Sequence, residues 1–315
     1  MKVFVAGGTG AIGRPLVPQL VTAGHEVVAT SRSAQGAEVV QRLGGEPAIV
    51  DGLDEHGLVE AVRRARPEVV IHEMTALAGK IDLRHFDRWF ATTNQLRTKG
   101  TDYLIRAARE AGARRLIVQS YSGWANSREG GAVKTEEDPL DPDPPKWQRE
   151  SMAAIRHIED TVPALEEIEG VVLRYGPLYG PDTGMTSSEG IDLIRKRRFP
   201  VVGDGGGVWS FVHTEDAASA TVAAVDHGAA GIYNVVDDDP APAREWLPYL
   251  AETIGAKPPR RVPVWLGRIA AGEVPVSWMT RIRGSSNAKA KRELGWQPRY
   301  ASWREGFAAV AGGAS

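Results

Sequence analysis

An apolar segment that runs directly into a glycine-rich turn opens this chain of 315 residues. Lys2–Ala6 has the composition of a buried β-strand, and the residues after it read Gly-Gly-Thr-Gly-Ala-Ile-Gly. Glycine permits a tight turn and a close approach of the backbone to a ligand, and a helix that starts at the turn offers free N–H groups and the positive end of its dipole. The pattern predicts a pyrophosphate-binding turn made by Gly7, Gly10, Ala11, Ile12 and Gly13.

Beyond this turn, apolar segments alternate with helical patterns. We expect buried strands at Met1–Ala6, Glu26–Thr30, Glu46–Val50, Glu68–His72, Arg114–Gln119 and Gly170–Tyr175. Helical spacing occurs at Ala11–Ala23, Ala34–Leu43, Asp54–Arg64, Arg84–Ala111 and Ser151–Glu167. This alternation indicates βαβ units, so the predicted fold class is α/β, a doubly wound Rossmann sheet of parallel strands with helices on both faces.

The alternation loosens after about residue 122. The acidic, proline-rich stretch 136–146 is predicted to be an exposed loop, and Pro163 should end or kink the helix after it. We predict a dinucleotide-binding core at 1–175, with 208–236 returning to it. A smaller C-terminal substrate lobe would comprise 176–207 and 237–315.

Composition excludes several classes of protein. Lys and Arg number 38 against 40 Asp and Glu, so the net charge of −2 gives no attraction to nucleic acid or to an acidic membrane. The absence of cysteine excludes a disulfide scaffold, a thiol nucleophile and a cysteine-ligated metal, and no histidine motif has metal-ligand spacing. No segment approaches the ~18 apolar residues of a membrane helix. We expect a soluble, cytoplasmic protein without a metal.

The end of the second expected strand bears on the choice of dinucleotide. A site that prefers NAD usually has an acidic residue there for the ribose 2′-hydroxyl, but this chain has Ser31 and Arg32. Arg32 can pair with a 2′-phosphate, and Arg14 can reach the same group. The pattern favours NADP(H), with NAD(H) possible; the alternative is two solvated arginines. Asp51, with Gly52 and Leu53 after it, is placed to accept from an adenine amino group or to cap the next helix.

These features together resemble the short-chain dehydrogenase/reductase superfamily, in its extended and atypical branch of NAD-dependent epimerases and dehydratases. The resemblance covers nearly the whole chain and is carried by GGTGAIGR, VVIHEMTAL, GTDYLIRAAREAGARRLIVQS, VVLRYGPLYGP, WSFVHTEDAASA, YNVVDDDP and NAKAKRELGWQPRY. It implies a nicotinamide cofactor across the strand ends, with Tyr175 at the end of the sixth strand among the residues that bind it. It also implies a homodimer that pairs the helices at 84–111 and 151–167.

One departure from the superfamily concerns catalysis. Its members normally use a Tyr-x-x-x-Lys pair, in which the lysine lowers the tyrosine pKa from ~10. None of the seven tyrosines here has a lysine four residues later. The resemblance aligns Tyr121 with the usual catalytic Ser or Thr, between Ser120 and Ser122. Tyr121 is therefore our candidate proton donor or oxyanion donor; the alternative is that it only packs against the end of the sheet.

Two further positions depart from the resemblance at the strand ends. Glu73 follows the fourth strand, where the superfamily usually has small residues, and a desolvated carboxyl there can act in acid–base chemistry. Its alternatives are to bind a ribose or an arginine. Arg97 occupies the position at which the superfamily's helix asparagine normally falls.

A last departure concerns the substrate. Nucleotide-sugar enzymes of this branch often carry an arginine that binds the diphosphate, and Trp209 stands at that position. An indole cannot neutralise a diphosphate, so a nucleotide sugar is disfavoured. The other tryptophans of the C-terminal part weakly favour a flat, apolar ligand, or else belong to the core: Trp246, Trp265, Trp278, Trp296 and Trp303.

The sequence therefore predicts an NADP(H)-dependent oxidoreductase that acts on a small or medium organic carbonyl or alcohol. Tyr121 is the expected catalytic group, with Ser120, Ser122 and Glu73 in support. Two alternatives stay open. One is an epimerase, dehydratase or lyase that retains its cofactor without net redox change, and the other is a non-catalytic regulator that senses NADP(H).

Overall fold

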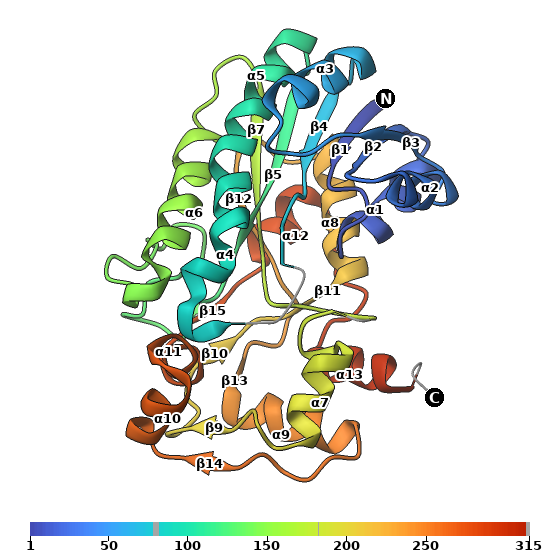
Figure 1. Ribbon diagram of the computed structural model, residues 1–315. Coiled ribbons are helices and arrows are strands. Elements are labelled where there is room, and N and C mark those ends of the chain that lie inside the picture. The colour runs from blue at the N-terminus through green and yellow to red at the C-terminus, as the bar shows by residue number, and fades with distance from the viewer. Residues whose placement is uncertain (78–81, 182, 313–315) are drawn as a thin grey trace.

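A seven-stranded parallel sheet forms the centre of the protein in the computed structural model, which describes residues 1–77, 82–181 and 183–312 (Figure 1). The spatial order is β12-β7-β5-β4-β1-β2-β3, and every neighbouring pair is parallel. The strands are β1 (Lys2–Ala6), β2 (Glu26–Ser31), β3 (Glu46–Ile49), β4 (Val69–His72), β5 (Arg115–Tyr121), β7 (Glu169–Tyr175) and β12 (Gly231–Val235). The six strands expected from the sequence are present, and β12 extends the sheet beside β7.

Helices cover both faces of the sheet. One face packs against α1 (Gly13–Thr22), α2 (Ala34–Arg42), α8 (Thr214–Asp226) and α12 (Ala288–Leu294). The other packs against α3 (Glu55–Ala65), α5 (Thr101–Ala111) and α6 (Arg149–Thr161). Strands buried on both faces need apolar residues at successive positions, which explains the Val- and Ile-rich composition of β4 and β5. The predicted doubly wound Rossmann fold is confirmed.

A second body of small elements lies across the carboxyl ends of the strands, in the lower half of Figure 1. Its helices are α7 (Ser188–Arg195), α9 (Ala243–Thr253), α10 (Val264–Ala271), α11 (Glu273–Thr280) and α13 (Trp303–Gly312). Its short strands pair as β6 (Val133–Lys134) with β15 (Gly284–Ser285), β8 (Leu178–Tyr179) with β11 (Val212–His213), β9 (Val201–Val202) with β14 (Arg261–Val262), and β10 (Val208–Trp209) with β13 (Ala241–Pro242). The division into core and substrate lobe at the stated boundaries stays a prediction.

The long helix expected at 84–111 is present but interrupted. A 3₁₀ turn, Leu83–His85, leads into α4 (Phe86–Gln95), and a π-helical turn, Leu96–Gly100, joins α4 to α5. Short π-helical turns occur often at functional sites. The expected loop at 136–146 contains no helix before its last residue, where the 3₁₀ turn Lys146–Gln148 begins, and α6 ends just before Pro163. A further 3₁₀ turn spans Gly184–Thr186, and no helix of the described residues is long and apolar enough to cross a membrane.

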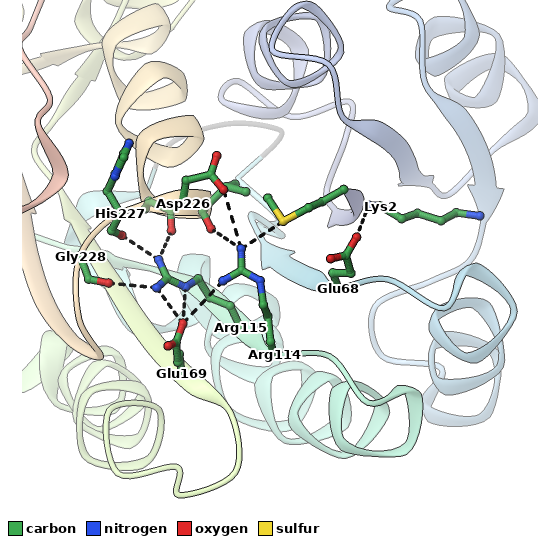
Figure 2. A network of polar contacts seen from close by, with 11 residues as sticks. Lys2, Glu68, Arg114, Arg115, Glu169, Asp226, His227 and Gly228 are labelled. Carbon is green, nitrogen blue, oxygen red and sulfur yellow. Dashed lines mark hydrogen bonds and ion pairs between the residues drawn. The ribbon is translucent and has the colours of Figure 1, made fainter.

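A polar network joins the sheet to α8 at the amino ends of the strands, as Figure 2 shows. The buried guanidinium of Arg115 donates to Glu169 and to the carbonyl oxygens of Ala224, His227 and Gly228, at 2.6–3.0 Å. Since carbonyls at a helix end have no partner within the helix, a cation there stabilises both the carbonyls and the helix dipole. The network lies at the opposite end of the strands from the glycine-rich turn.

Candidate active site

The glycine-rich turn lies between the end of β1 and the start of α1. The Gly7 N–H donates to Thr30 Oγ1 at 2.8 Å and the Gly8 N–H to the Thr30 carbonyl at 3.2 Å, so β2 holds the turn in place. Gly7 has φ +105°, and a Cβ there would lie 2.7 Å from the backbone of Glu73. A Cβ at Gly13 would overlap the Gly7 carbonyl oxygen. Both positions therefore require glycine.

Backbone donors at the start of α1 point away from the helix. The N–H groups of Ala11, Ile12 and Gly13 donate to no acceptor in the described part of the chain. A phosphate needs such donors at the positive end of a helix dipole. The residues of this turn thus fit the pyrophosphate of a dinucleotide.

Candidate residues for the adenosine end lie beside the same turn. Arg32 and Arg14 are exposed, and Arg14 Nε donates to the Thr9 carbonyl at 3.1 Å. The buried Ser31 hydroxyl donates to the Ser33 carbonyl at 2.7 Å, so it shapes the turn after β2. Asp51 is exposed, and one of its oxygens accepts from the Leu53 N–H at 2.8 Å.

The turn after β3 packs closely against the segment after β4. Asp54, rather than Asp51, caps α3 by accepting from the Gly57 N–H at 3.1 Å. Gly52 is buried, and a Cβ on it would overlap the Met74 sulfur. Gly52 is therefore explained by packing between the two turns.

A buried carboxyl, Glu73, lies at the end of β4. Its Oε1 accepts from the Tyr175 hydroxyl at 2.9 Å, and that hydroxyl also lies 2.6 Å from Thr221 Oγ1 on α8. Its Oε2 is enclosed and has no hydrogen-bond partner among the described residues. Burial raises the pKa of Glu73 to about 8, against a smaller lowering effect of the Tyr175 hydrogen bond. Glu73 is therefore a neutral acid at pH 7 and carries a proton beside the glycine-rich turn.

The preceding residue, His72, is fully buried and neutral. Its Nδ1 accepts from the Met74 N–H at 3.1 Å, and its Nε2 lies 3.0 Å from the Leu96 carbonyl, to which it donates. Burial is the largest cause that lowers the pKa of His72 to about 4. His72 therefore connects β4 to the π-helical turn.

The two serines at the end of β5 bond to different parts of the structure. Ser120 donates to Glu159 Oε1 at 2.8 Å, and Glu159 forms a buried ion pair with Arg174. The Ser122 hydroxyl hydrogen bonds to the Ser285 hydroxyl, and the Ser122 N–H donates to the Tyr175 carbonyl at 2.9 Å. Ser120 thus binds to α6, whereas Ser122 connects β5 to β15.

Tyr121 lies between these serines, half-buried, and its hydroxyl has no hydrogen bond to any described residue. Its ring stacks on Trp124, with 5.3 Å between the ring centroids. Burial raises the pKa of Tyr121 above its usual value, and the positive charge of Arg97 opposes that effect. The Arg97 guanidinium has no hydrogen bond in the described structure, and sequence reasoning had not included this residue in the candidate site. The available signal in the sequence was that Arg97 occupies the position of the superfamily's helix asparagine.

Four of the six C-terminal tryptophans are core residues. Trp209 is 5% exposed, packs against Phe211 and Trp246, and donates from its indole nitrogen to the Trp278 carbonyl at 3.2 Å. The remaining buried ones are Trp246, Trp296 and Trp303. Their number in the sequence therefore reflects packing and gives no support to a flat ligand.

Comparisons with known proteins identify the family. The model of the NAD dependent epimerase/dehydratase family matches residues 3–236. The chain belongs to that family. Among solved structures, UDP-glucose 4-epimerase from Thermotoga maritima, with UDP-glucose, has a TM-score of 0.77 at 23% identity, covering 99% of this chain and 98% of that chain. The Thermus thermophilus UDP-glucose 4-epimerase in complex with NAD has a TM-score of 0.74 at 27% identity, with the same coverage.

Two curated relatives in this family are reductases by name. The 3-diazoavenalumate denitrifying reductase of a Streptomyces species is 43% identical over 310 residues, which are 98% of this chain and 99% of that protein. A ketoreductase of Stigmatella aurantiaca that acts on a 4-hydroxy-2-methyl-3-oxo-4-farnesyl-3,4-dihydroquinoline-1-oxide is 30% identical over 95% of this chain and 92% of its own length. The protein is an NAD(P)-dependent enzyme of the oxidoreductase or epimerase type.

Proposed function

We propose that this protein is an NADPH-dependent reductase that transfers hydride to a small or medium organic substrate. The observation that carries the proposal is the match, over 98% of the chain, to a relative named as a reductase. A second relative named as a ketoreductase adds to it. When bound, NADPH supplies the hydride; the residues of this chain bind it, orient the substrate and supply a proton.

Preference for NADPH is supported by the charges beside the glycine-rich turn. Arg32 follows β2, at the position where a site that prefers NAD has an acidic residue, which would repel a 2′-phosphate. Arg14 is an exposed residue in the first turn of α1. Neither arginine has an ion pair with a described carboxylate. Both guanidinium groups are thus available to a phosphate.

Two electrophiles fit the reductase proposal. Hydride addition to a carbonyl carbon breaks the C=O π bond and leaves an alkoxide, which takes a proton. At a diazonium carbon, hydride forms the C–H bond while the C–N bond breaks and N₂ leaves, so no proton is consumed. The ketoreductase relative supports the first electrophile and the denitrifying relative supports the second.

We assign the proton for carbonyl reduction to Tyr121, whose hydroxyl is unbonded at the end of β5. Neutral Glu73 is the supporting acid, because Tyr175 bonds to one of its oxygens and leaves the other to hold the proton. Ser120 and Ser122 support Tyr121 through their own bonds to α6 and β15, which fix the end of the strand.

Cofactor choice and reductase activity are tested together. Purified enzyme is titrated with NADPH and NADH, and NADPH oxidation is followed with benzaldehyde and with 4-hydroxybenzenediazonium as probes. Arg32→Ala should weaken NADPH binding and leave NADH binding unchanged; Arg42→Ala, an exposed arginine on α2, is the matched control. Equal NADPH affinity in both variants contradicts the role of Arg32. Substrate isomerisation with no change in cofactor concentration would instead favour the epimerase alternative.

We also infer a homodimer, from the resemblance, through the long helices α4–α5 and α6. Light scattering coupled to gel filtration tests it directly. A monomer mass near 34.0 kDa contradicts it.

A further inference from the structure

The guanidinium of Arg97 is buried, its charge acts on Tyr121, and no carboxylate among the described residues forms an ion pair with it. Arg97 belongs to the π-helical turn, and the residue is 3% exposed. Its Nε and Nη1 are enclosed and have no hydrogen-bond partner among the described residues. Nη2 has no partner there either, but it is not enclosed. A buried charge without a partner is costly, so its retention calls for an explanation in function.

The charges around Arg97 leave it uncompensated. Glu159 is the carboxylate that acts on it, but both Glu159 oxygens accept from Arg174, at 2.8 and 2.6 Å, and Ser120 adds a third hydrogen bond. The other facing groups, His72 and Tyr121, are neutral at pH 7. Burial lowers the pKa of Arg97 to about 10, while Tyr121 and Glu159 oppose that effect, so the guanidinium keeps its charge.

One aromatic ring lies near this charge, and a series of ring contacts leads from it to Tyr121. The guanidinium carbon lies 5.6 Å from the ring centroid of Phe90, which stacks on the Phe86 ring with 4.2 Å between the centroids. The rings of Phe86 and Trp124 form a T-shaped pair with 5.4 Å between their centroids, and Trp124 stacks on Tyr121. An isolated cation among rings is a suitable environment for a flat organic anion, because the surrounding apolar groups strengthen its attraction to the guanidinium.

We propose that Arg97 binds the carboxylate of an aromatic substrate and holds that substrate beside Tyr121. The assignment deepens the proposed reductase function, since it names an aromatic carboxylic acid as the substrate class of the same site. Nη2 is the donor that the carboxylate reaches first. The substrate carboxylate supplies the counter-ion that the described residues do not.

A binding measurement tests this proposal without turnover. Cinnamate and cinnamamide have the same ring and length but differ in charge, and their affinities are measured by calorimetry with and without saturating NADP⁺. A charged hydrogen bond to Arg97 should make cinnamate bind roughly 10- to 100-fold more tightly. Equal affinity of the two probes for the unaltered enzyme overturns the proposal. An enzyme that binds cinnamate selectively but reduces no probe instead contradicts the reductase function alone.

Variants assign the preference to the residue. Arg97→Met should abolish the preference for cinnamate, whereas Arg88→Met, an exposed arginine on α4, should retain it. A preference that survives Arg97→Met overturns the proposal. Arg97→Lys is the second variant in case the methionine variant does not fold. Lysine keeps the positive charge but lacks the planar guanidinium that can donate two parallel hydrogen bonds to a carboxylate. The preference for cinnamate should therefore shrink, and an unchanged preference overturns the assignment.

Discussion

Replacing Glu73 by glutamine should flatten the dependence of stability on pH. Glu73 ordinarily has a pKa of 4.5, but burial raises it to about 8 in the folded enzyme. Below pH 4.5 both the folded and the unfolded states hold the proton. Between the two values the unfolded state ionises first, so the free energy of unfolding falls as pH rises. The decrease in the free energy of unfolding approaches its full size above pH 8.

The size of this loss follows from the two pKa values. One pKa unit corresponds to about 1.4 kcal/mol, so the carboxyl costs about 1 kcal/mol at pH 5 and about 5 kcal/mol at pH 8.5. Glutamine has the same shape, accepts from Tyr175 through its Oε1 and does not ionise. Its amide leaves buried N–H groups without partners, but that cost is the same at both pH values.

The assay is urea unfolding of the cofactor-free enzyme at pH 5 and pH 8.5. Relative to the unaltered enzyme, the free energy of unfolding of Glu73→Gln should gain about 4 kcal/mol between the two pH values. His72, whose pKa burial lowers to about 4, affects both proteins equally and cancels in the difference. Glu26→Gln, an exposed carboxyl at the start of β2, is the matched control. A Glu73→Gln variant with the same pH slope as the unaltered enzyme would refute a neutral, buried Glu73.

Three further predictions concern other parts of the molecule. Tyr121→Phe should slow carbonyl reduction by about 10²- to 10⁴-fold and leave diazonium reduction unchanged, as stopped-flow rates with both probes would reveal; equal losses contradict its role as proton donor. Arg115→Met removes the donors to three carbonyls at the end of α8 and should cost about 3 kcal/mol in thermal or urea unfolding, whereas a loss below about 1 kcal/mol means that water replaces the guanidinium. Gly13→Ala should destabilise the fold by about 1–3 kcal/mol and abolish NADPH binding in fluorescence titrations, since its Cβ overlaps the Gly7 carbonyl oxygen; full affinity would show that the turn can shift.

The fold was predictable because its signals are local. A strand, a glycine turn and a helix follow one another within residues 2–22, and the same alternation continues to β5. The roles of the serines were not predictable in this way. Ser120 bonds to a residue 39 positions away and Ser122 to one 163 positions away, and no local pattern specifies such partners.

Arg97 illustrates the same limit within the site. An arginine in a helix most often lies in solvent, so residue type alone argues against burial. Its enclosure depends on how the π-helical turn packs against α4, α5 and α6, which only the assembled structure defines. Trp209 shows the opposite case, because its indole is part of the core although its sequence position suggested contact with a ligand.

The late arrival of β12 in the sequence has a consequence for how the protein folds. β7 ends at residue 175, but the strand that pairs with its outer edge and the helix α8 that covers that face come only at 214–235. A fragment ending at residue 175 would expose one unpaired strand edge and the apolar side chains of Val171 and Leu173. During synthesis, the seven-stranded sheet cannot be completed before part of the second body has emerged from the ribosome. We expect the two bodies to unfold in one cooperative transition, and the first 175 residues alone to aggregate.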